Sequence, residues 1–262
     1  MTRAEVGMSH WPAVAAFIVV LLLWELIVWV AGIEPYVLPA PHVVLWTLFT
    51  DRVTLFASLW VTLKTTFEAL LLAGFGGFVL ALLFSRWHWA ERAFLPFAVV
   101  LQVTPIIAIA PLLLIYLDGQ AAVLVCDFLV AFFPILSNTA VGLSSADRNL
   151  ADLFKLYGAS GWQNLFLLRL PTALPYFFAG LRIGGGLALI GAIAAEIAAG
   201  SAGQGTGLAF RILEAGYRLK IPRMFAALTL ISLSGIAIYL ALTLLSHLVL
   251  RRWHESAQEG RR

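Results

Sequence analysis

The sequence predicts an all-α polytopic membrane protein with six transmembrane helices. Hydrophobic residues make up 61% of the 262-residue chain, charged residues only 12%, and the mean hydropathy is +0.94. A soluble domain has about 45–50% apolar and about 25% charged residues. Because this much apolar surface cannot all be buried within one water-soluble core of this size, lipid must solvate much of it.

Six apolar runs are close to the roughly 20 residues that a helix needs to cross a bilayer. They are Pro12–Ala31, Leu59–Phe84, Phe94–Leu117, Ala121–Leu143, Ala173–Ala199 and Met224–Leu250. The first is longer than the apolar part of a signal peptide and ends without a small-residue cleavage site, so we expect it to be retained. The third contains Pro96, Pro105 and Pro111 and should be kinked or interrupted. In the second, Lys64 and Glu68 stand four residues apart and can pair on one helix face.

The distribution of Lys and Arg predicts that both termini are cytoplasmic. With the amino terminus inside, the inside segments hold ten of these residues and the outside segments hold five, which satisfies the positive-inside rule. The basic residues lie in short segments between apolar runs, as membrane topology produces, so we expect no binding to nucleic acid. The single cysteine, Cys126, excludes a disulfide within the chain.

Two connecting segments are long enough to fold, Ser144–Thr172 inside and Gly200–Arg223 outside. The inside segment contains a short amphipathic helix whose apolar residues repeat at helical spacing: Leu150, Leu153, Phe154 and Tyr157. Asp147 or Asn149 can cap its start, and Gly158 is suited to end it in the left-handed conformation. A second short helix, at about 161–168, leads to Pro171. Apolar residues outside the spans must lie on the membrane surface or bind another protein.

This inside segment resembles the conserved cytoplasmic loop of permease subunits of ATP-binding-cassette (ABC) importers. The family pattern is Glu-Ala-Ala, three residues, Gly, nine residues, Ile, one residue and Leu-Pro. Here Asp152-Leu153-Phe154, Gly158, Leu168 and Leu170-Pro171 fit that spacing without a gap. The departures are Asp for Glu, Leu-Phe for Ala-Ala and Leu for Ile, and only Phe154 changes the type of residue.

Three other segments resemble the nitrate, sulfonate and taurine branch of these permeases, and the similarity therefore runs over nearly the whole chain. They are Leu38-Pro39-Ala40-Pro41, the run from Thr104-Pro105 to Pro111, and Gly205-Thr206-Gly207-Leu208. The branch also contains importers of riboflavin and of the pyrimidine precursor of thiamine. The resemblance thus implies a small polar organic solute or anion as substrate, without choosing among these compounds.

The resemblance implies a fold like that of type I ABC importer permeases, with residues 1–262 as a single transmembrane domain in the inner (plasma) membrane. It also implies a homodimer, two cytoplasmic ABC ATPase subunits and a periplasmic or extracellular substrate-binding protein. In the family, the loop helix docks into a groove on the ATPase and transmits its closing motion to the pore. Carried over by position within the coupling loop 144–172, the coupling residues are Asp152, Leu153, Phe154, Gly158, Ala159, Leu170 and Pro171.

Polar residues inside spans are costly and often functional. Gln102, Thr104 and Asn138 are the candidates for lining a substrate pathway, and an interhelical hydrogen bond is the alternative for each. Arg182, about ten residues into its helix, needs a partner. Two residues, Asp127 and Glu196, lie nearer the outer ends of their spans, where contact with water is expected. Two glycine clusters predict close helix packing: Gly74, Gly76 and Gly77, and Gly184, Gly185 and Gly186.

The chain contains no Gly-x4-Gly-Lys-Ser/Thr phosphate-binding pattern. We therefore expect the partner ATPase to bind ATP and Mg, and this chain to hold no cofactor, metal or catalytic residue. An intramembrane protease would need a Ser–His or paired-Asp arrangement, but Ser137 lacks a well-placed His and Asp127 lacks a second Asp. An ion-coupled secondary transporter remains the alternative, although the sequence lacks recognisable inverted symmetry.

Overall fold

The computed structural model describes residues 11–200 and 205–251, and every regular element in them is helical. In chain order these elements are α1 (Trp11–Val30), α2 (Pro41–Thr50), α3 (Arg52–Arg86), α4 (His88–Val103), α5 (Ile106–Tyr116), α6 (Gly119–Ser144), α7 (Arg148–Leu156), α8 (Gly161–Asn164), the π-helical turn η1 (Leu165–Arg169), α9 (Leu170–Ala199), α10 (Leu208–Tyr217) and α11 (Ile221–Leu250).

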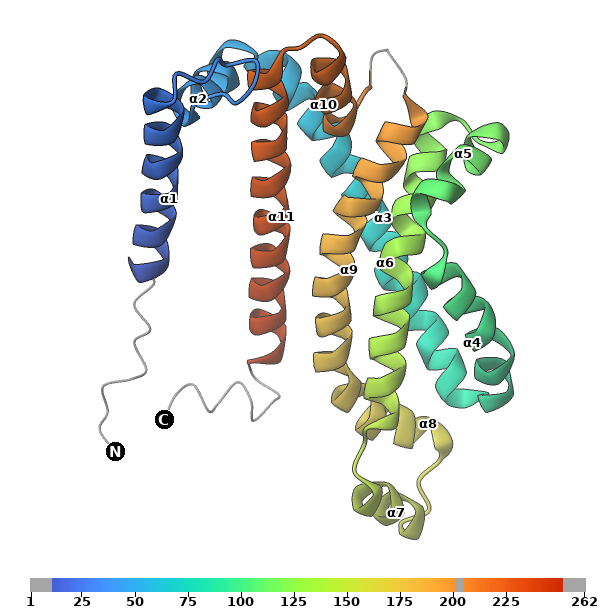
Figure 1. Ribbon diagram of the computed structural model, residues 1–262. Coiled ribbons are helices and arrows are strands. Elements are labelled where there is room, and N and C mark those ends of the chain that lie inside the picture. The colour runs from blue at the N-terminus through green and yellow to red at the C-terminus, as the bar shows by residue number, and fades with distance from the viewer. Residues whose placement is uncertain (1–10, 201–204, 252–262) are drawn as a thin grey trace, which may run out of the picture.

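The described helices confirm an all-α chain with six crossings. Five helical segments are long and apolar enough to span a membrane: Trp11–Val30, Arg52–Arg86, Gly119–Ser144, Gly161–Ala199 and Ile221–Leu250. The sixth crossing is made by α4 and α5 in series (Figure 1). They are separated at Thr104 and Pro105, whose backbones are extended with ψ of 124°. Pro105 causes this break because it lacks an N–H and disfavours the helical region for the residue before it, so the predicted interruption is confirmed.

The second helix predicted at about 161–168 is confirmed, since α8 and η1 cover residues 161–169. It was not expected to continue, but Gly161–Ala199 is one continuous helical segment. Pro171 does not end a helix. It occupies the first turn of α9, directly after the π-helical turn η1. Proline lacks the N–H that would donate to the carbonyl of Leu167, and in a regular α-helix its ring would clash with that carbonyl. The wider π-helical turn that precedes Pro171 leaves room for the ring.

Glycines set the close packing of α3, α6 and α9. A Cβ at Gly184 would lie 3.0 Å from the carbonyl oxygen of Ala131, and one at Gly77 would lie 3.1 Å from Ile135. At Gly142 it would lie only 2.9 Å from the Cα of Ala173. Within the two predicted clusters, the packing role is confirmed at Gly77, Gly184 and Gly185. A Cβ at Gly74 or Gly76 would meet side chains at an ordinary 3.4–3.5 Å, and one at Gly186 would meet nothing within 4 Å.

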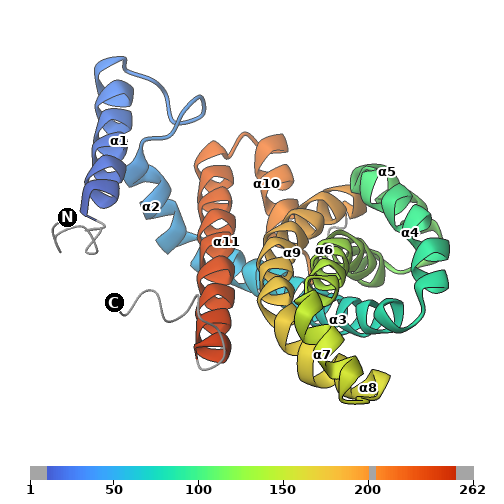
Figure 2. The ribbon, with the colours of Figure 1, turned by 90° about the horizontal axis from the view of Figure 1, so that it is seen from below.

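The first helix stands apart from this bundle (Figure 2). In the 18-residue apolar stretch of α1 only 6% of the residues are buried, compared with 39% in that of α3 and 50% in that of the segment containing α9. Its ring contact with α11 joins Trp24 to Phe225, with centroids 5.8 Å apart. Most of its apolar surface is therefore left for lipid or another chain.

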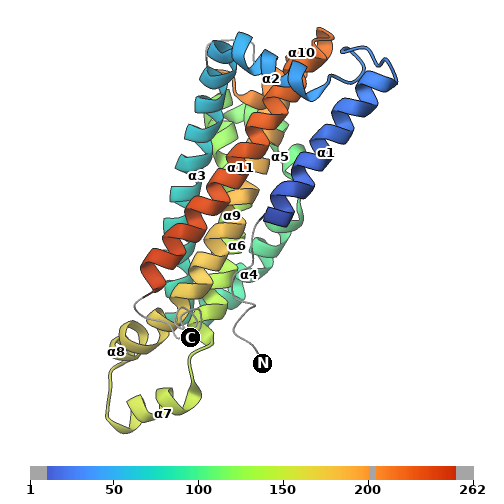
Figure 3. The same cartoon turned by 90° about the vertical axis from the view of Figure 1, so that its left-hand side faces the viewer.

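The molecule has two distinct ends (Figure 3). The short helices α7 and α8 lie at one, and α2 and α10 lie at the other. The first turn of α1 and the last turn of α11 are both on the α7 side, as an even number of crossings requires.

The predicted pair of Lys64 and Glu68 is present in α3, with 3.9 Å between Nζ and Oε1.

Candidate functional site

The α7 helix begins and ends as the sequence predicts. Asp147 is the cap, and its carboxylate accepts a 2.7 Å hydrogen bond from the backbone N–H of Asn149. Gly158 has φ +68°, while the N–H of Ala159 donates to the carbonyl of Phe154 at 2.9 Å and closes the helix. No atom lies within 4 Å of the position of a Cβ at Gly158, so its backbone conformation alone favours glycine.

The surface of α7 is open, because none of its residues is buried. Leu156 is 85% exposed and the neighbouring Tyr157 is 83% exposed. Asp152 is also exposed and pairs only with Lys155 on the same helix, at 2.8 Å. The structure thus gathers Asp152 and apolar side chains on one projecting helix (Figure 3).

The remaining predicted coupling residues divide between this helix and its attachment. Leu153 is exposed, whereas Phe154 and Ala159 are half-buried. Leu170 and Pro171 are half-buried in the first turn of α9. They belong to the segment 160–171 that connects α7 to α9, which we call the stem, and not to the exposed surface of α7.

That stem is firmly attached to the bundle. Ser160 and Gln163 form a capping box, with Ser160 N–H donating to Gln163 Oε1 at 2.7 Å and Gln163 N–H donating to Ser160 Oγ at 3.2 Å. Leu165 and Leu168 are buried, and Arg169 donates to Ser85 on α3 at 3.4 Å. Sequence reasoning missed the capping box, although the Ser-x-x-Gln spacing was available to indicate it.

The break between α4 and α5 borders a cavity of about 310 Å3. Gln102 and Thr104 line it together with residues of α6 and Leu187 of α9. Asn138 does not line this cavity, and its side-chain amide donates to the carbonyl of Pro134 at 2.8 Å on its own helix. Of the three predicted pathway residues, the structure therefore brings two together and places the third elsewhere.

At the α10 end, the side chain of Glu196 on α9 joins this helix to α3 and to α10. Its carboxylate accepts hydrogen bonds from the hydroxyl of Thr62 at 2.7 Å and from the N–H of Ala209 at 3.0 Å. The Thr62 oxygen in turn accepts from the N–H of Leu208 at 2.9 Å. A side chain at Gly207 would overlap the Glu196 carboxylate, so this glycine makes the contact possible. The carboxylate thus satisfies the start of α10.

The expected contact of Asp127 and Glu196 with water was wrong. Asp127 is fully buried where α6 faces Gly191 of α9, and neither of its carboxylate oxygens has a hydrogen-bond partner among the described residues. Glu196 is 7% exposed. Asp127 is covered by α9 and Glu196 by the start of α10, which the hydropathy pattern alone does not reveal.

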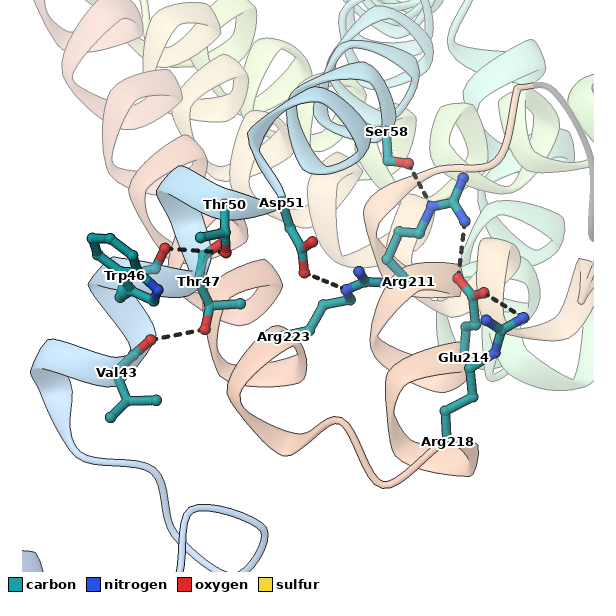
Figure 4. Close-up of polar contacts among 10 residues, drawn as sticks. All are labelled: Val43, Trp46, Thr47, Thr50, Asp51, Ser58, Arg211, Glu214, Arg218 and Arg223. Carbon is teal, nitrogen blue, oxygen red and sulfur yellow. Dashed lines mark hydrogen bonds and ion pairs between the residues drawn. The ribbon is translucent and has the colours of Figure 1, made fainter.

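One ion pair fixes the hairpin of α10 and α11 to the rest of this end, and two more lie within the hairpin (Figure 4). Arg223 Nε lies 2.6 Å from Asp51 Oδ2. Glu214 accepts from Arg211 at 2.9 Å and from Arg218 at 3.0 Å. The hydrogen bond from Arg211, supported by the nearby charges of Arg218 and Arg223, lowers the pKa of Glu214 below its usual value.

These features define a multi-pass membrane protein with a projecting amphipathic helix at one end and a braced hairpin at the other. Residues 73–255 match the family described as the binding-protein-dependent transport system inner membrane component. The chain belongs to this family of ABC importer permeases, which are transport components and not enzymes.

Relatives extend this similarity over nearly the whole chain. A "probable ABC transporter permease protein" of Haemophilus influenzae is 33% identical over 87% of this chain and 92% of its own length. The riboflavin transport system permease protein of Chloroflexus aurantiacus is 31% identical over 94% and 92%. The formylaminopyrimidine transport permease protein of Halalkalibacterium halodurans is 33% identical over 89% and 92%.

Proposed function

We propose that two copies of this chain form the pore of an ATP-driven importer and that separate ATPase subunits drive it through α7 by alternating access. The observation that carries this proposal is the exposed α7 helix on its rigid stem. Apolar side chains beside Asp152 have no cover within the described chain, yet the helix is capped and braced. An ordered, uncovered amphipathic helix fits a docking contact with another protein.

The proposed orientation places the α7 end in the cytoplasm, where ATP is available. The excess of Lys and Arg in the segments on that side supports it. ATP and Mg are then bound by the partner, and this chain contributes the contact surface of Asp152, Leu153, Phe154, Gly158 and Ala159, held by Leu170 and Pro171. Residues 1–262 act as one transmembrane domain.

A second copy completes the pore in this proposal, because α9 leaves one face uncovered within the chain. Exposed residues recur along it at Ile183, Ile190 and Ile197. Arg182 lies beside this face, and within the described part of the chain it has no hydrogen bond or ion pair. A lone arginine in a membrane span is costly unless it meets water or a partner. A homodimer with a water-filled pathway supplies both.

The proposed substrate is a small polar organic solute or anion delivered by an external binding protein. Relatives with names that specify riboflavin, formylaminopyrimidine and nitrate support this range. Gln102 and Thr104, at the break beside the cavity, are the proposed pathway residues, together with Asn138. The partly unwound backbone there supplies polar groups inside an otherwise apolar span.

The test compares Gly158→Val with Gly161→Val. Neither position has an atom within 4 Å of a Cβ, but only Gly158 has a positive φ. Valine at Gly158 should reshape the end of α7 and uncouple ATP hydrolysis from transport, while valine at Gly161 should be tolerated.

Both variants are reconstituted with the ATPase in liposomes, and solute uptake is measured beside ATP turnover. Mass measurement of the purified complex checks for two copies of each subunit. Normal uptake by a fully assembled Gly158→Val complex would show that α7 is not the coupling element.

A further inference from the structure

The turn between α10 and α11 lies at the end opposite α7 (Figure 1), and it carries large side chains that are exposed to solvent. Tyr217 is 82% exposed and Leu219 is 73% exposed. Arg218 and Lys220, which alternate with them, are also exposed. We call residues 217–220 the hairpin tip. Its mixture of an aromatic, an aliphatic and two cationic side chains resembles the composition of protein interfaces more than that of an ordinary solvated turn.

The hairpin tip is held rigidly. The N–H of Lys220 donates to the carbonyl of Ala215 at 2.8 Å, and the N–H of Leu219 donates to that of Gly216 at 3.1 Å. Behind it, Arg223 is paired with Asp51, and Arg211 donates to Ser58 at 2.9 Å (Figure 4). The exposed side chains are therefore displayed in a fixed arrangement, which lowers the entropy lost when a partner binds.

Leu219 has φ +54°, and among the described residues it is the only non-glycine residue with a positive φ. It occupies the left-handed position that ends α10, where the two hydrogen bonds described above close the helix. Glycine is the usual residue at such a position, because the Cβ of a leucine crowds the following carbonyl. The leucine side chain is therefore not needed to end the helix, and it is exposed to a partner.

The charge of the hairpin tip selects the kind of partner. Arg211 and Arg223 are turned inward into ion pairs, and their side chains are only 21% and 19% exposed. Arg218 shares the carboxylate of Glu214 with Arg211, and Lys220 has no acidic partner among the described residues. Positive charge is therefore in excess at the tip, and it favours an acidic surface.

Lipid is the other surface that the hairpin tip could meet, but its position favours a soluble partner. The 30 residues of α11 extend about 45 Å, whereas the hydrocarbon layer is about 30 Å thick. The tip ends at Lys220, Arg223 follows it, and the apolar run of α11 begins only at Met224. The tip thus stands outside the hydrocarbon, at the level of α2 (Figure 3).

We infer that the hairpin tip is a docking site for the acidic face of the soluble substrate-binding protein, with Tyr217 and Leu219 as apolar anchors and Lys220 as the steering charge. This inference rests on the proposed function, which places this end outside the cell membrane. Arg211 and Arg223 in the same loop take no part in this docking site, because they brace the hairpin through Ser58 and Asp51.

The test uses the complete complex of permease and ATPase in nanodiscs, titrated with solute-loaded binding protein identified from the gene neighbourhood. The readout is the concentration that half-maximally stimulates ATP turnover. Tyr217→Ser with Leu219→Gly should raise this concentration by about tenfold or more, as loss of interface anchors does. Lys220→Glu should raise it at low salt and less at high salt.

Arg52→Glu is the matched control, since Arg52 is exposed at the same end but lies outside the hairpin tip. It should leave the half-maximal concentration unchanged. Leu219→Gly should also keep or raise the thermal midpoint, which shows that the hairpin still folds.

An unchanged half-maximal concentration in every tip variant, with a wild-type complex that responds normally, would overturn the docking site alone. If the variants instead alter dependence on anionic lipid without changing that concentration, the tip is a membrane anchor and the inference is also wrong. A wild-type complex that never responds to a binding protein would overturn the proposed function itself.

Discussion

The contact between α6 and α9 at Gly142 offers a quantitative test of the packing. In Gly142→Ala, the new methyl group would lie 2.7 Å from the Cβ of Tyr176 and 2.9 Å from the Cα of Ala173. Ala173 contributes backbone, so the two helices themselves must separate. Overpacking of this kind costs about 1–3 kcal/mol, whereas exchanging glycine for alanine within a helix gains about 0.5–1 kcal/mol.

Gly76→Ala is the control, because its methyl group would meet Phe132 at an ordinary 3.5 Å. It keeps the gain from helix propensity without the overpacking, so the difference between the variants isolates the steric cost of about 1–3 kcal/mol. Thermal unfolding of the purified proteins in one detergent measures it, at roughly 2–4 °C for each kcal/mol. A Gly142→Ala protein that melts at or above Gly76→Ala would refute the close approach of α6 and α9.

Two further predictions concern the α10 end. Gly207→Ala should push the Glu196 carboxylate away from the start of α10, and hydrogen–deuterium exchange should show faster exchange at Leu208 and Ala209; unchanged protection there would contradict this role. Because the pKa of Glu214 is lowered, its stabilising ion pairs should persist from neutral pH down to its unfolded pKa of about 4.3 and be lost as the pH falls further through the folded pKa. The difference in thermal midpoint between wild type and Glu214→Gln should therefore be constant above about pH 5 and shrink below pH 4, whereas a difference that shrinks between pH 7 and 6 would exclude Glu214 as its source.

Features encoded by neighbouring residues could be predicted from the sequence. Asp147 as a cap and Gly158 as a helix end each depend on a few adjacent backbone groups, and the break before Pro105 depends on the proline ring itself. The continuation of the second short helix through Pro171 was not predicted, because a proline can follow one helix or begin the next. Only the π-helical turn that precedes it makes the helix continuous.

Features that depend on distant parts of the chain could not be predicted. Arg211 and Arg223 are basic loop residues in the sequence, but their partners Ser58 and Asp51 lie 153 and 172 residues away. The Thr62–Glu196 bond spans 134 residues. No local pattern reveals that such residues brace the hairpin, so the exposed Tyr217 and Leu219 were not considered as candidates.

The long helix α9 gives the molecule a simple mechanical element. Its 30 residues are about 45 Å long, and they start on the α7 side and carry Glu196 near the far end. A helix that tilts by about 5° around its midpoint moves each end by about 2 Å in opposite directions, given a half-length of about 22 Å. Such a displacement is enough to break a 2.7 Å hydrogen bond. A push at the α7 end of this helix would therefore release α10 at the opposite end of the molecule, without any signal passing through side chains in between.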